Sequence, residues 1–177
     1  MEAQQVFRTR WGWMGMAATQ RGVGRIVLPQ SSRQAVTAEL RRQPWGKGPM
    51  ALGALRLAQR QLARYLSGES RSLDFPVDLS QGSAFQRRVW LAAKRIPYGR
   101  ARSYQWIATR VGGKRYARAV GTALGANPVP IIVPCHRVVA QDGSLGGFSG
   151  GLRNKRRLLD LEGTLAQLRR GRRVNGH

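Results

Sequence analysis

The sequence predicts an α+β fold: a small N-terminal domain of sheet plus helices, then a mostly helical C-terminal domain with a helix-turn-helix, winged-helix-like motif. Three observations lead to this. Apolar, β-favouring runs lie near the N-terminus, helical apolar spacing dominates later, and a Gly-, Ser-, Asp- and Pro-rich stretch over 68–82 separates the two patterns. We place the domains at 1–80 and 81–165, followed by a basic mobile tail over 166–177.

The N-terminal domain is expected to begin with a β-hairpin and continue with two helices. Residues 6–19 are rich in Trp, Met and Val, and a turn-like stretch separates them from the apolar run 26–28, which indicates two strands. Ser31 and Ser32 can cap a short helix. Apolar residues at helical spacing over 50–66 predict a longer second helix.

Capping serines and helix-breaking glycines divide the C-terminal domain into short helices. They are expected at 84–95, 104–111, 116–126 and 152–161. The second and third are joined by Gly112 and Gly113, which suggests a helix-turn-helix, although many helix pairs share this pattern. A short strand is expected at Val138 and Val139.

The charge is strongly positive and unevenly distributed. The sequence has 31 Lys plus Arg against 8 Asp plus Glu, and +16 of the net +23 lies from Gln81 onward. This favours a polyanionic partner, with nucleic acid the simplest one, although a generally Arg-rich composition could explain part of the excess. Lys114, Arg115 and Arg118 lie near a helix start, where cations oppose the helix dipole, so an anionic partner accounts for them better than local stability.

Cysteine and histidine are scarce, which limits disulfide and metal chemistry. Cys135 is the only cysteine and there are two histidines, too few for a usual structural zinc site, so we expect no metal and no cofactor. The first ten residues have no apolar signal-peptide core, and no apolar run approaches the length of a membrane span. We therefore expect a cytoplasmic protein.

The segment around the single cysteine is the candidate site. Residues 127–139 read NPVPIIVPCHRVV, and the three prolines hold the backbone in a fixed path. A lone cysteine is usually a buried small hydrophobe. Cys135, however, is followed directly by His136 and Arg137, and a nearby base or positive charge favours the reactive thiolate.

These residues also carry a family resemblance. Pro134 to Val138, reading PCHRV and preceded by NPVP at 127–130, resembles the active-site signature of the O6-alkylguanine-DNA alkyltransferases, also called methylated-DNA–protein-cysteine methyltransferases. The resemblance extends over about 82–163, whereas the N-terminal half resembles the family only in layout.

The resemblance implies DNA repair by direct reversal. A methyl or larger alkyl group would pass irreversibly from O6 of guanine, or from O4 of thymine as a second substrate, to Cys135 in a single-turnover reaction. The implied partner is double-stranded DNA containing O6-alkylguanine. We expect a monomer in solution that can assemble cooperatively on DNA, and no membrane partner.

The resemblance also assigns roles to individual residues. Cys135 would accept the alkyl group, His136 would take the thiol proton through a water, and Glu162 would orient the imidazole. Tyr104 would contact the target nucleotide and assist the departing guanine. The second helix of the motif would enter the minor groove, and Arg118 would fill the space that the flipped nucleotide leaves in the base stack. Further DNA contacts are expected at Ser103, Lys114, Arg115, Ala117 and Gly121. The substrate pocket is expected to include Asn127, Val138, Phe148, Ser149 and Gly150.

The sequence departs from the family pattern at two places. Phe148 stands where the family often has Tyr, so a hydroxyl that could stabilise the leaving group is absent and the range of bulky adducts stays open. The zinc-binding residues found in the N-terminal domain of some relatives have no counterpart here, because the only cysteine is Cys135.

Two other functions remain as alternatives. A thiol hydrolase would use the same Cys and His, but it predicts turnover and does not explain the positive charge around the site. A non-catalytic DNA-binding damage sensor explains the charge and the helix pair equally well. Such sensors lack the acceptor cysteine, which this chain retains as Cys135.

Overall fold

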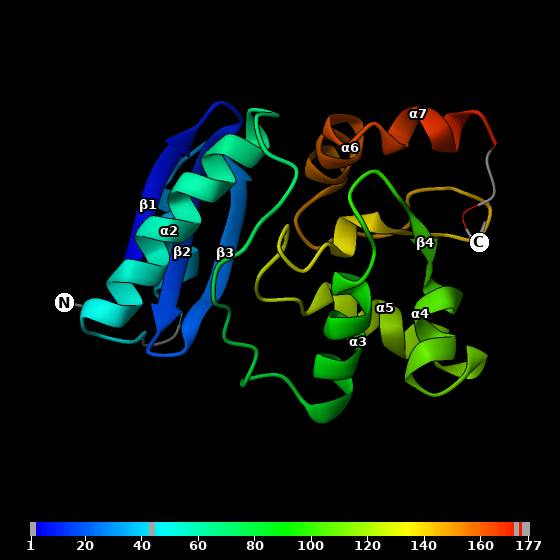
Figure 1. The fold of residues 1–177 in the computed structure, drawn as a ribbon, viewed down its shortest axis with the longest axis horizontal. Coiled ribbons are helices and arrows are strands. Elements are labelled where there is room, and N and C mark those ends of the chain that lie inside the picture. Colours follow the sequence, from blue (N-terminus) through cyan, green and yellow to red (C-terminus); the bar gives the residue numbers. More distant parts are fainter. Residues whose placement is uncertain (1–2, 43–44, 172–173, 175–177) are drawn as a thin grey trace. The chain divides into compact units, whose positions relative to one another are not determined.

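The computed structural model describes residues 3–42, 45–171 and 174 and divides into two compact units, Met1–Gln81 and Gly82–His177 (Figure 1). The first unit combines a small antiparallel sheet with helices, and the second is mostly helical. The α+β prediction is confirmed. Within the described residues, no helix combines the length and the apolar character needed to cross a bilayer.

The sheet of the first unit has three strands in the order β1 (Gln4–Thr9), β2 (Gly12–Thr19) and β3 (Gly22–Gln30), all antiparallel. The sequence predicted one strand over 6–19, whereas the structure places two there. Thr9 closes the intervening turn, because its hydroxyl donates to the carbonyl of Gly12 at 3.0 Å and accepts the N–H of Trp11 at 3.1 Å. A side chain–backbone turn of this kind leaves little compositional signal.

Two helices complete the first unit. They are α1 (Arg33–Leu40), capped by the hydroxyl of Ser32, and α2 (Pro49–Leu66), which lies across one face of the sheet in Figure 1. Residues of β2, β3 and α1 form a core cluster together with Trp45, whose indole N–H donates to the carbonyl of Leu40 at 2.7 Å. The sheet and α1 therefore share this core.

Three helices in mutual contact open the second unit. They are α3 (Ala84–Lys94), α4 (Tyr104–Val111) and α5 (Ala117–Gly125). Ser83 and Gln86 form a reciprocal capping box on α3, and Ser103 caps α4 by accepting the N–H of Trp106 at 3.1 Å. Between α4 and α5 the chain forms a short 3-10 helix, Lys114–Tyr116, where the sequence predicted the start of the second helix.

Two short strands and two helices complete the second unit. The short strands β4 (Arg102–Ser103) and β5 (Val138–Val139) pair in parallel, and the helices α6 (Leu152–Leu161) and α7 (Thr164–Arg169) follow. The sequence predicted a mobile tail from residue 166, whereas in the structure α7 extends to Arg169. Val174 is buried in a cluster with Ala101, Val139 and Leu159. Leu165 and Leu168, at helical spacing on α7, pack on that cluster. Burial of these apolar side chains orders the segment in spite of its basic composition. Residues 172–173 and 175–177 of the expected tail lie outside the described residues.

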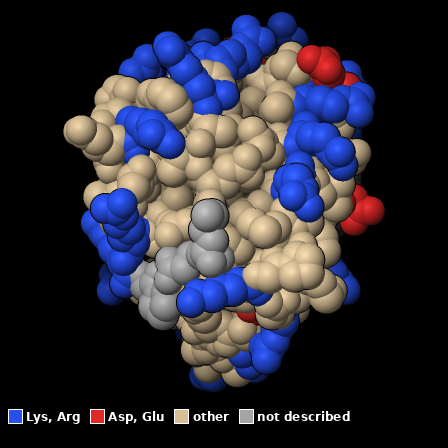
Figure 2. Space-filling model, turned by 90° about the vertical axis from the view of Figure 1, so that its left-hand side faces the viewer, with Lys and Arg blue, Asp and Glu red and all other residues tan. Residues whose placement is uncertain are grey.

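Positive side chains cover much of the surface. Lys and Arg clearly outnumber acidic residues on the face that Figure 2 shows, as the net charge of +23 requires. Most of this charge has no internal carboxylate to pair with, because the sequence contains only eight acids. The molecule therefore presents a strongly basic surface to solvent.

Trp90 of α3 joins α3 to α5 in the core of the second unit. Its side chain is 2% exposed and its indole N–H donates to the carbonyl of Ala123 at 2.7 Å. Gly82 leaves room for the ring, because a Cβ there would lie 2.3 Å from an indole carbon. This contact fixes α5, the helix that contributes one wall of the site.

Trp90→Phe should lower the free energy of unfolding by about 1–3 kcal/mol, because it removes ring volume and leaves the Ala123 carbonyl without its donor. Urea titration followed by circular dichroism measures this. Leu91→Ala is the matched control, since Leu91 is 55% exposed on the same helix and its truncation should change stability little. Equal losses in both variants would contradict the role of Trp90.

Candidate active site

A rigid segment leads from the end of α5 to Cys135, and Asn127 organises it. The Asn127 side-chain carbonyl accepts the N–H of Val129 at 3.0 Å, while its amide donates to the carbonyl of Val133 at 2.9 Å. The same amide nitrogen lies 3.1 Å from Sγ of Cys135. Asn127 therefore forms an ordinary Asx turn and also holds the thiol in place.

The backbone of this segment is strained at one residue. Ile131 has φ of 78°, and among the described residues it is the only non-glycine with positive φ. This conformation is unfavourable for a β-branched side chain and persists only where surrounding contacts enforce it. Here the neighbouring prolines and the Asn127 hydrogen bonds supply that constraint.

The thiol of Cys135 is buried and protonated at rest. Cys135 begins a short 3-10 helix, Cys135–Arg137, and is 5% exposed. Burial raises the pKa of the thiol to about 11, although the hydrogen bond from Asn127 and the positive charge of Lys155 act in the opposite direction. A nucleophilic reaction at neutral pH therefore needs a base that removes this proton.

His136 is placed to act as that base. Its imidazole is fully buried, with Nε2 2.6 Å from Oε1 of Glu162. Burial lowers the pKa of His136, with Glu162 opposing the shift, so the ring is neutral at neutral pH. Nδ1 of His136 is buried without a hydrogen-bond partner among the described residues, and it carries the lone pair when Nε2 donates to Glu162.

Glu162 is also held by a cation, Arg137. Nε of Arg137 donates to Oε2 of Glu162 at 2.8 Å and Nη2 donates to Oε1 at 3.1 Å, while Nη1 donates to the carbonyl of Ile96 at 2.6 Å. Burial opposes ionisation of Glu162, but hydrogen bonds from His136 and Arg137 outweigh it and lower the pKa of the carboxyl to about 2. From the sequence, Arg137 was expected only to be a positive neighbour of Cys135. Its guanidinium supports Glu162 instead.

Lys155 of α6 is a further site residue that the sequence analysis missed. Its side chain is fully buried, and Nζ donates to the carbonyls of Val138, at 2.7 Å, Leu145, and Gly147, at 3.3 Å. Burial lowers the pKa of Lys155 to about 8, and the charge of Cys135 opposes the shift. Lys155 therefore ties the loop after β5 to the strand and brings a positive charge to the thiol. Lys155 could have been identified by its helical spacing with the buried leucines of α6. It was overlooked because it stands within the basic run 153–157.

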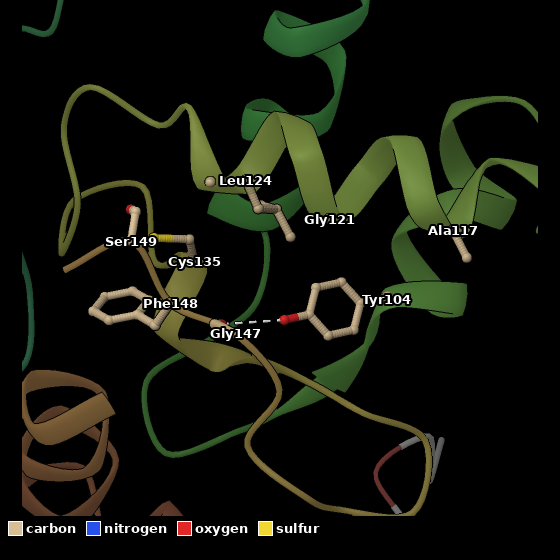
Figure 3. Close-up of a pocket in the computed structure, with 9 residues that line it drawn as sticks. Tyr104, Ala117, Gly121, Leu124, Cys135, Gly147, Phe148 and Ser149 are labelled. Atoms are coloured by element: carbon tan, nitrogen blue, oxygen red, sulfur yellow. Dashed lines mark hydrogen bonds between the residues drawn. The ribbon is translucent and has the colours of Figure 1, made fainter. Parts of the chain in front are cut away.

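The thiol faces a pocket of about 500 Å³. Nine residues line it: Tyr104, Ala117, Gly121, Leu124, Gly125, Cys135, Gly147, Phe148 and Ser149. Figure 3 shows Tyr104 on one side of this space and Cys135, Phe148 and Ser149 on the other, with the Tyr104 hydroxyl donating to the carbonyl of Gly147 at 3.4 Å. Burial, and then the charge of Cys135, raises the pKa of Tyr104, so its phenol remains a proton donor.

The other predicted site residues lie outside the pocket lining. Lys114 and Arg115 are exposed in the short 3-10 helix before α5, and Arg118 is exposed in the first turn of α5. Ser103 is 1% exposed and caps α4, so it positions Tyr104 rather than presenting its hydroxyl to a ligand. Gly150 accepts the side-chain amide of Asn154 at 3.0 Å. Within the described residues, no group of three or more His, Cys, Asp or Glu side chains could hold a metal ion.

Comparison with known proteins gives one consistent result. Residues 84–164 match the family model described as 6-O-methylguanine DNA methyltransferase, DNA binding domain. A methylated-DNA–protein-cysteine methyltransferase from Mycolicibacterium paratuberculosis is 48% identical over 126 residues, which cover 71% of this chain and 74% of that protein. This chain belongs to the methylated-DNA–protein-cysteine methyltransferase family. The prediction from the PCHRV segment is confirmed.

Solved structures of similar proteins agree with this membership of the methyltransferase family. Mycobacterium tuberculosis OGT, crystallised in complex with DNA, has a TM-score of 0.74 and 40% identity over 90% of this chain and 91% of its own. An O6-methylguanine-DNA methyltransferase from Pyrococcus kodakaraensis has a TM-score of 0.67 and 25% identity over 92% and 99%. Both similarities include the N-terminal unit. From the sequence alone, this unit resembled the family only in layout.

Glu162→Gln in this methyltransferase should lower the free energy of unfolding at pH 7 by about 3–5 kcal/mol, because it leaves the buried Arg137 without its counter-charge. The folded pKa near 2 lies below the ordinary value of 4.5. The carboxylate's contribution to stability is therefore full above pH 4.5 and disappears as pH falls toward 2. The difference between wild type and variant should shrink over that range in urea titrations. Asp160→Asn, an exposed site on α6, is the control, and a pH-independent difference would contradict the assignment.

Lys155→Met should slow alkyl transfer by about tenfold or more. Loss of the Lys155 charge raises the pKa of the Cys135 thiol, and each pKa unit corresponds to a tenfold loss of thiolate. The change also frees the loop that carries Phe148. The second-order rate constant, followed against pH, should show thiolate formation moved to higher pH, which a purely structural defect would not produce. Lys155→Arg should restore part of the rate. Arg153→Ala, exposed on the same helix, is the control, and an unshifted pH profile in Lys155→Met would contradict the electrostatic role.

Proposed function

We propose that this chain repairs alkylated DNA by direct reversal, moving the alkyl group from O6 of guanine to Sγ of Cys135 irreversibly and once per molecule. The observation that carries this proposal is the position of Cys135 beside a base-sized pocket with His136, Glu162 and Arg137 arranged behind it. Family membership supports the same reaction.

The proposed transfer is a displacement at the alkyl carbon. The thiol proton passes through a water to Nδ1 of His136, and Glu162 stabilises the resulting imidazolium. The bond between Sγ and carbon forms as the bond between carbon and O6 breaks, and the electron pair of the broken bond stays on guanine. The purine takes up a proton as it leaves, with the Tyr104 phenol as the donor in the pocket. The products are guanine and a stable thioether.

The nucleotide must leave the duplex for this reaction, because a thiol that is 5% exposed cannot reach O6 of a stacked base. We propose that α4 and α5 act as a helix-turn-helix, with α5 in the minor groove and Arg118 in the vacated stack. Arg118, Lys114 and Arg115 are exposed without an acidic partner among the described residues, which supports a contact with phosphates. The relative from M. tuberculosis was crystallised in complex with DNA.

The lining of the pocket bears on which adducts fit. Gly121 and Gly125 of α5 and Gly147 of the loop before Phe148 line the pocket without side chains, and Phe148 contributes a ring without a hydroxyl. We propose that O6-alkylguanine is the main substrate, because Tyr104 can protonate a purine, and that O4-alkylthymine is a secondary one. Since the acceptor thiol must stay reduced, we place the reaction in the cytoplasm.

Mixing the protein with a duplex that contains O6-methylguanine should make the protein heavier by one methyl group, located at Cys135 by peptide mass spectrometry. Repeated additions of substrate should give no second event. Cys135→Ser should abolish transfer but keep affinity for the duplex. Release of more than one product per protein would favour a thiol hydrolase, and tight binding with unchanged mass would favour a damage sensor.

A further inference from the structure

Arg102, Trp106 and Arg110 form a stack of two guanidinium groups on one indole. Cζ of Arg110 lies 3.4 Å from the centroid of the Trp106 ring, and Cζ of Arg102 lies 5.5 Å from it. Trp106 and Arg110 are four residues apart and therefore share one face of α4, and Arg102 reaches the same indole from the strand before the helix. Such contacts hold long arginine side chains in a defined orientation.

The two guanidinium groups have no acidic partner in the part of the chain that the structure describes. Arg102 donates to the carbonyl of Ala101 at 3.0 Å and Arg110 donates to that of Trp106 at 3.2 Å, and neither forms an ion pair. Between Asp78 and Asp142 the sequence contains no Asp or Glu at all. Each guanidinium therefore retains donors and an uncompensated charge beside a second positive charge, an arrangement that an external anion would relieve.

The stack lies close to the pocket along the chain. Tyr104 begins α4, and Arg110 follows it by six residues, which corresponds to a rise of about 9 Å along the helix. Residues two apart on a helix point to different sides, so Trp106 and its two arginines lie on a different side of α4 from the Tyr104 ring. The basic turn after α4, with exposed Lys114 and Arg115, continues the positive surface.

We propose that the Arg102–Trp106–Arg110 stack binds the phosphodiester backbone of duplex DNA outside the pocket that receives the flipped nucleotide. The inference rests on the proposed function, because it takes duplex DNA as the partner. Two preordered guanidinium forks at fixed spacing fit a row of phosphates better than a single free anion. Since stacking has already restricted these side chains, they lose less conformational entropy on binding than free arginines would.

The test compares two double variants that remove the same charge. Arg102→Ala/Arg110→Ala removes the stack, while Arg56→Ala/Arg60→Ala removes two exposed arginines, also four residues apart, from α2 in the first unit. Affinity for an undamaged duplex is measured over a series of salt concentrations. The stack variant should lose about two from the slope of log affinity against log salt, about 0.9 for each lost phosphate contact, whereas the control should keep the wild-type slope.

Two further variants separate geometry from charge. Trp106→Leu keeps both charges but removes the platform, so affinity should fall several-fold. Arg102→Lys/Arg110→Lys should keep most of the slope. Equal slope losses in the two alanine double variants would overturn the proposal, because they would indicate only the general field of the protein. Poly-glutamate binding that is lost in the stack variant while duplex binding is retained would also overturn it.

Alkyl transfer from free O6-methylguanine base separates this inference from the proposed function. All variants should react with the free base at the wild-type rate, because none of the changed residues lines the pocket. If the wild type reacts with neither the free base nor the damaged duplex, the proposed function fails, while the salt slopes on undamaged DNA still decide whether the stack binds phosphates.

Discussion

The carboxylate of Glu162 is the interaction on which the rest of the site depends. It is buried at the end of α6 and accepts from both His136 and Arg137, two consecutive residues of the short helix that begins with the nucleophile. Through Arg137 the same network reaches the carbonyl of Ile96, just after α3. One negative charge thus fixes the imidazole tautomer and fastens the active-site helix to two other elements of its unit. A buried carboxylate that accepts hydrogen bonds from the neutral His136 ring and from the Arg137 guanidinium remains ionised, and this keeps His136 able to accept a proton and hold the resulting charge.

This network explains how a reactive thiol can remain inert until substrate arrives. Cys135 at rest is buried and protonated, so it reacts poorly with small electrophiles. The groups that favour the thiolate, the amide of Asn127 and the charge of Lys155, are fixed in advance, and the base lies in the same short helix. Preorganised groups need no rearrangement as charge develops in the transition state. Selectivity therefore comes from access to the pocket rather than from a permanently activated nucleophile.

Much of this architecture could be predicted from the sequence, and the failures share a physical cause. The capping serines located α1, α3 and α4, and the prolines and His136 around Cys135 indicated the nucleophile, because these signals are local. Glu162 is distant in the sequence, and only the family resemblance indicated its role. The turn between β1 and β2 was missed because a threonine hydroxyl closes it without an Asn-Gly or Asp-Gly pair. Lys155 and the contact of Arg137 with Glu162 were missed because, in a chain with so many Lys and Arg residues, each one is expected to be exposed to solvent. Only the tertiary fold decides which of them is buried. Positive φ at Ile131 is likewise imposed by packing around two prolines, against the local preference of the residue.

The same features that make Cys135 a good acceptor make it usable only once. Alkylation converts the thiolate, which Asn127 and Lys155 stabilise, into a neutral thioether that can no longer accept those interactions as a charge. The carbon–sulfur bond has a poor leaving group, and reversing the transfer would require the buried thiolate to depart from an unactivated carbon. A hydrolase solves this by admitting water to an acyl intermediate with an electrophilic carbonyl, whereas an alkyl group offers no such carbon. Irreversibility therefore follows from the chemistry of the adduct, and none of the residues that line the pocket offers a route to reverse it.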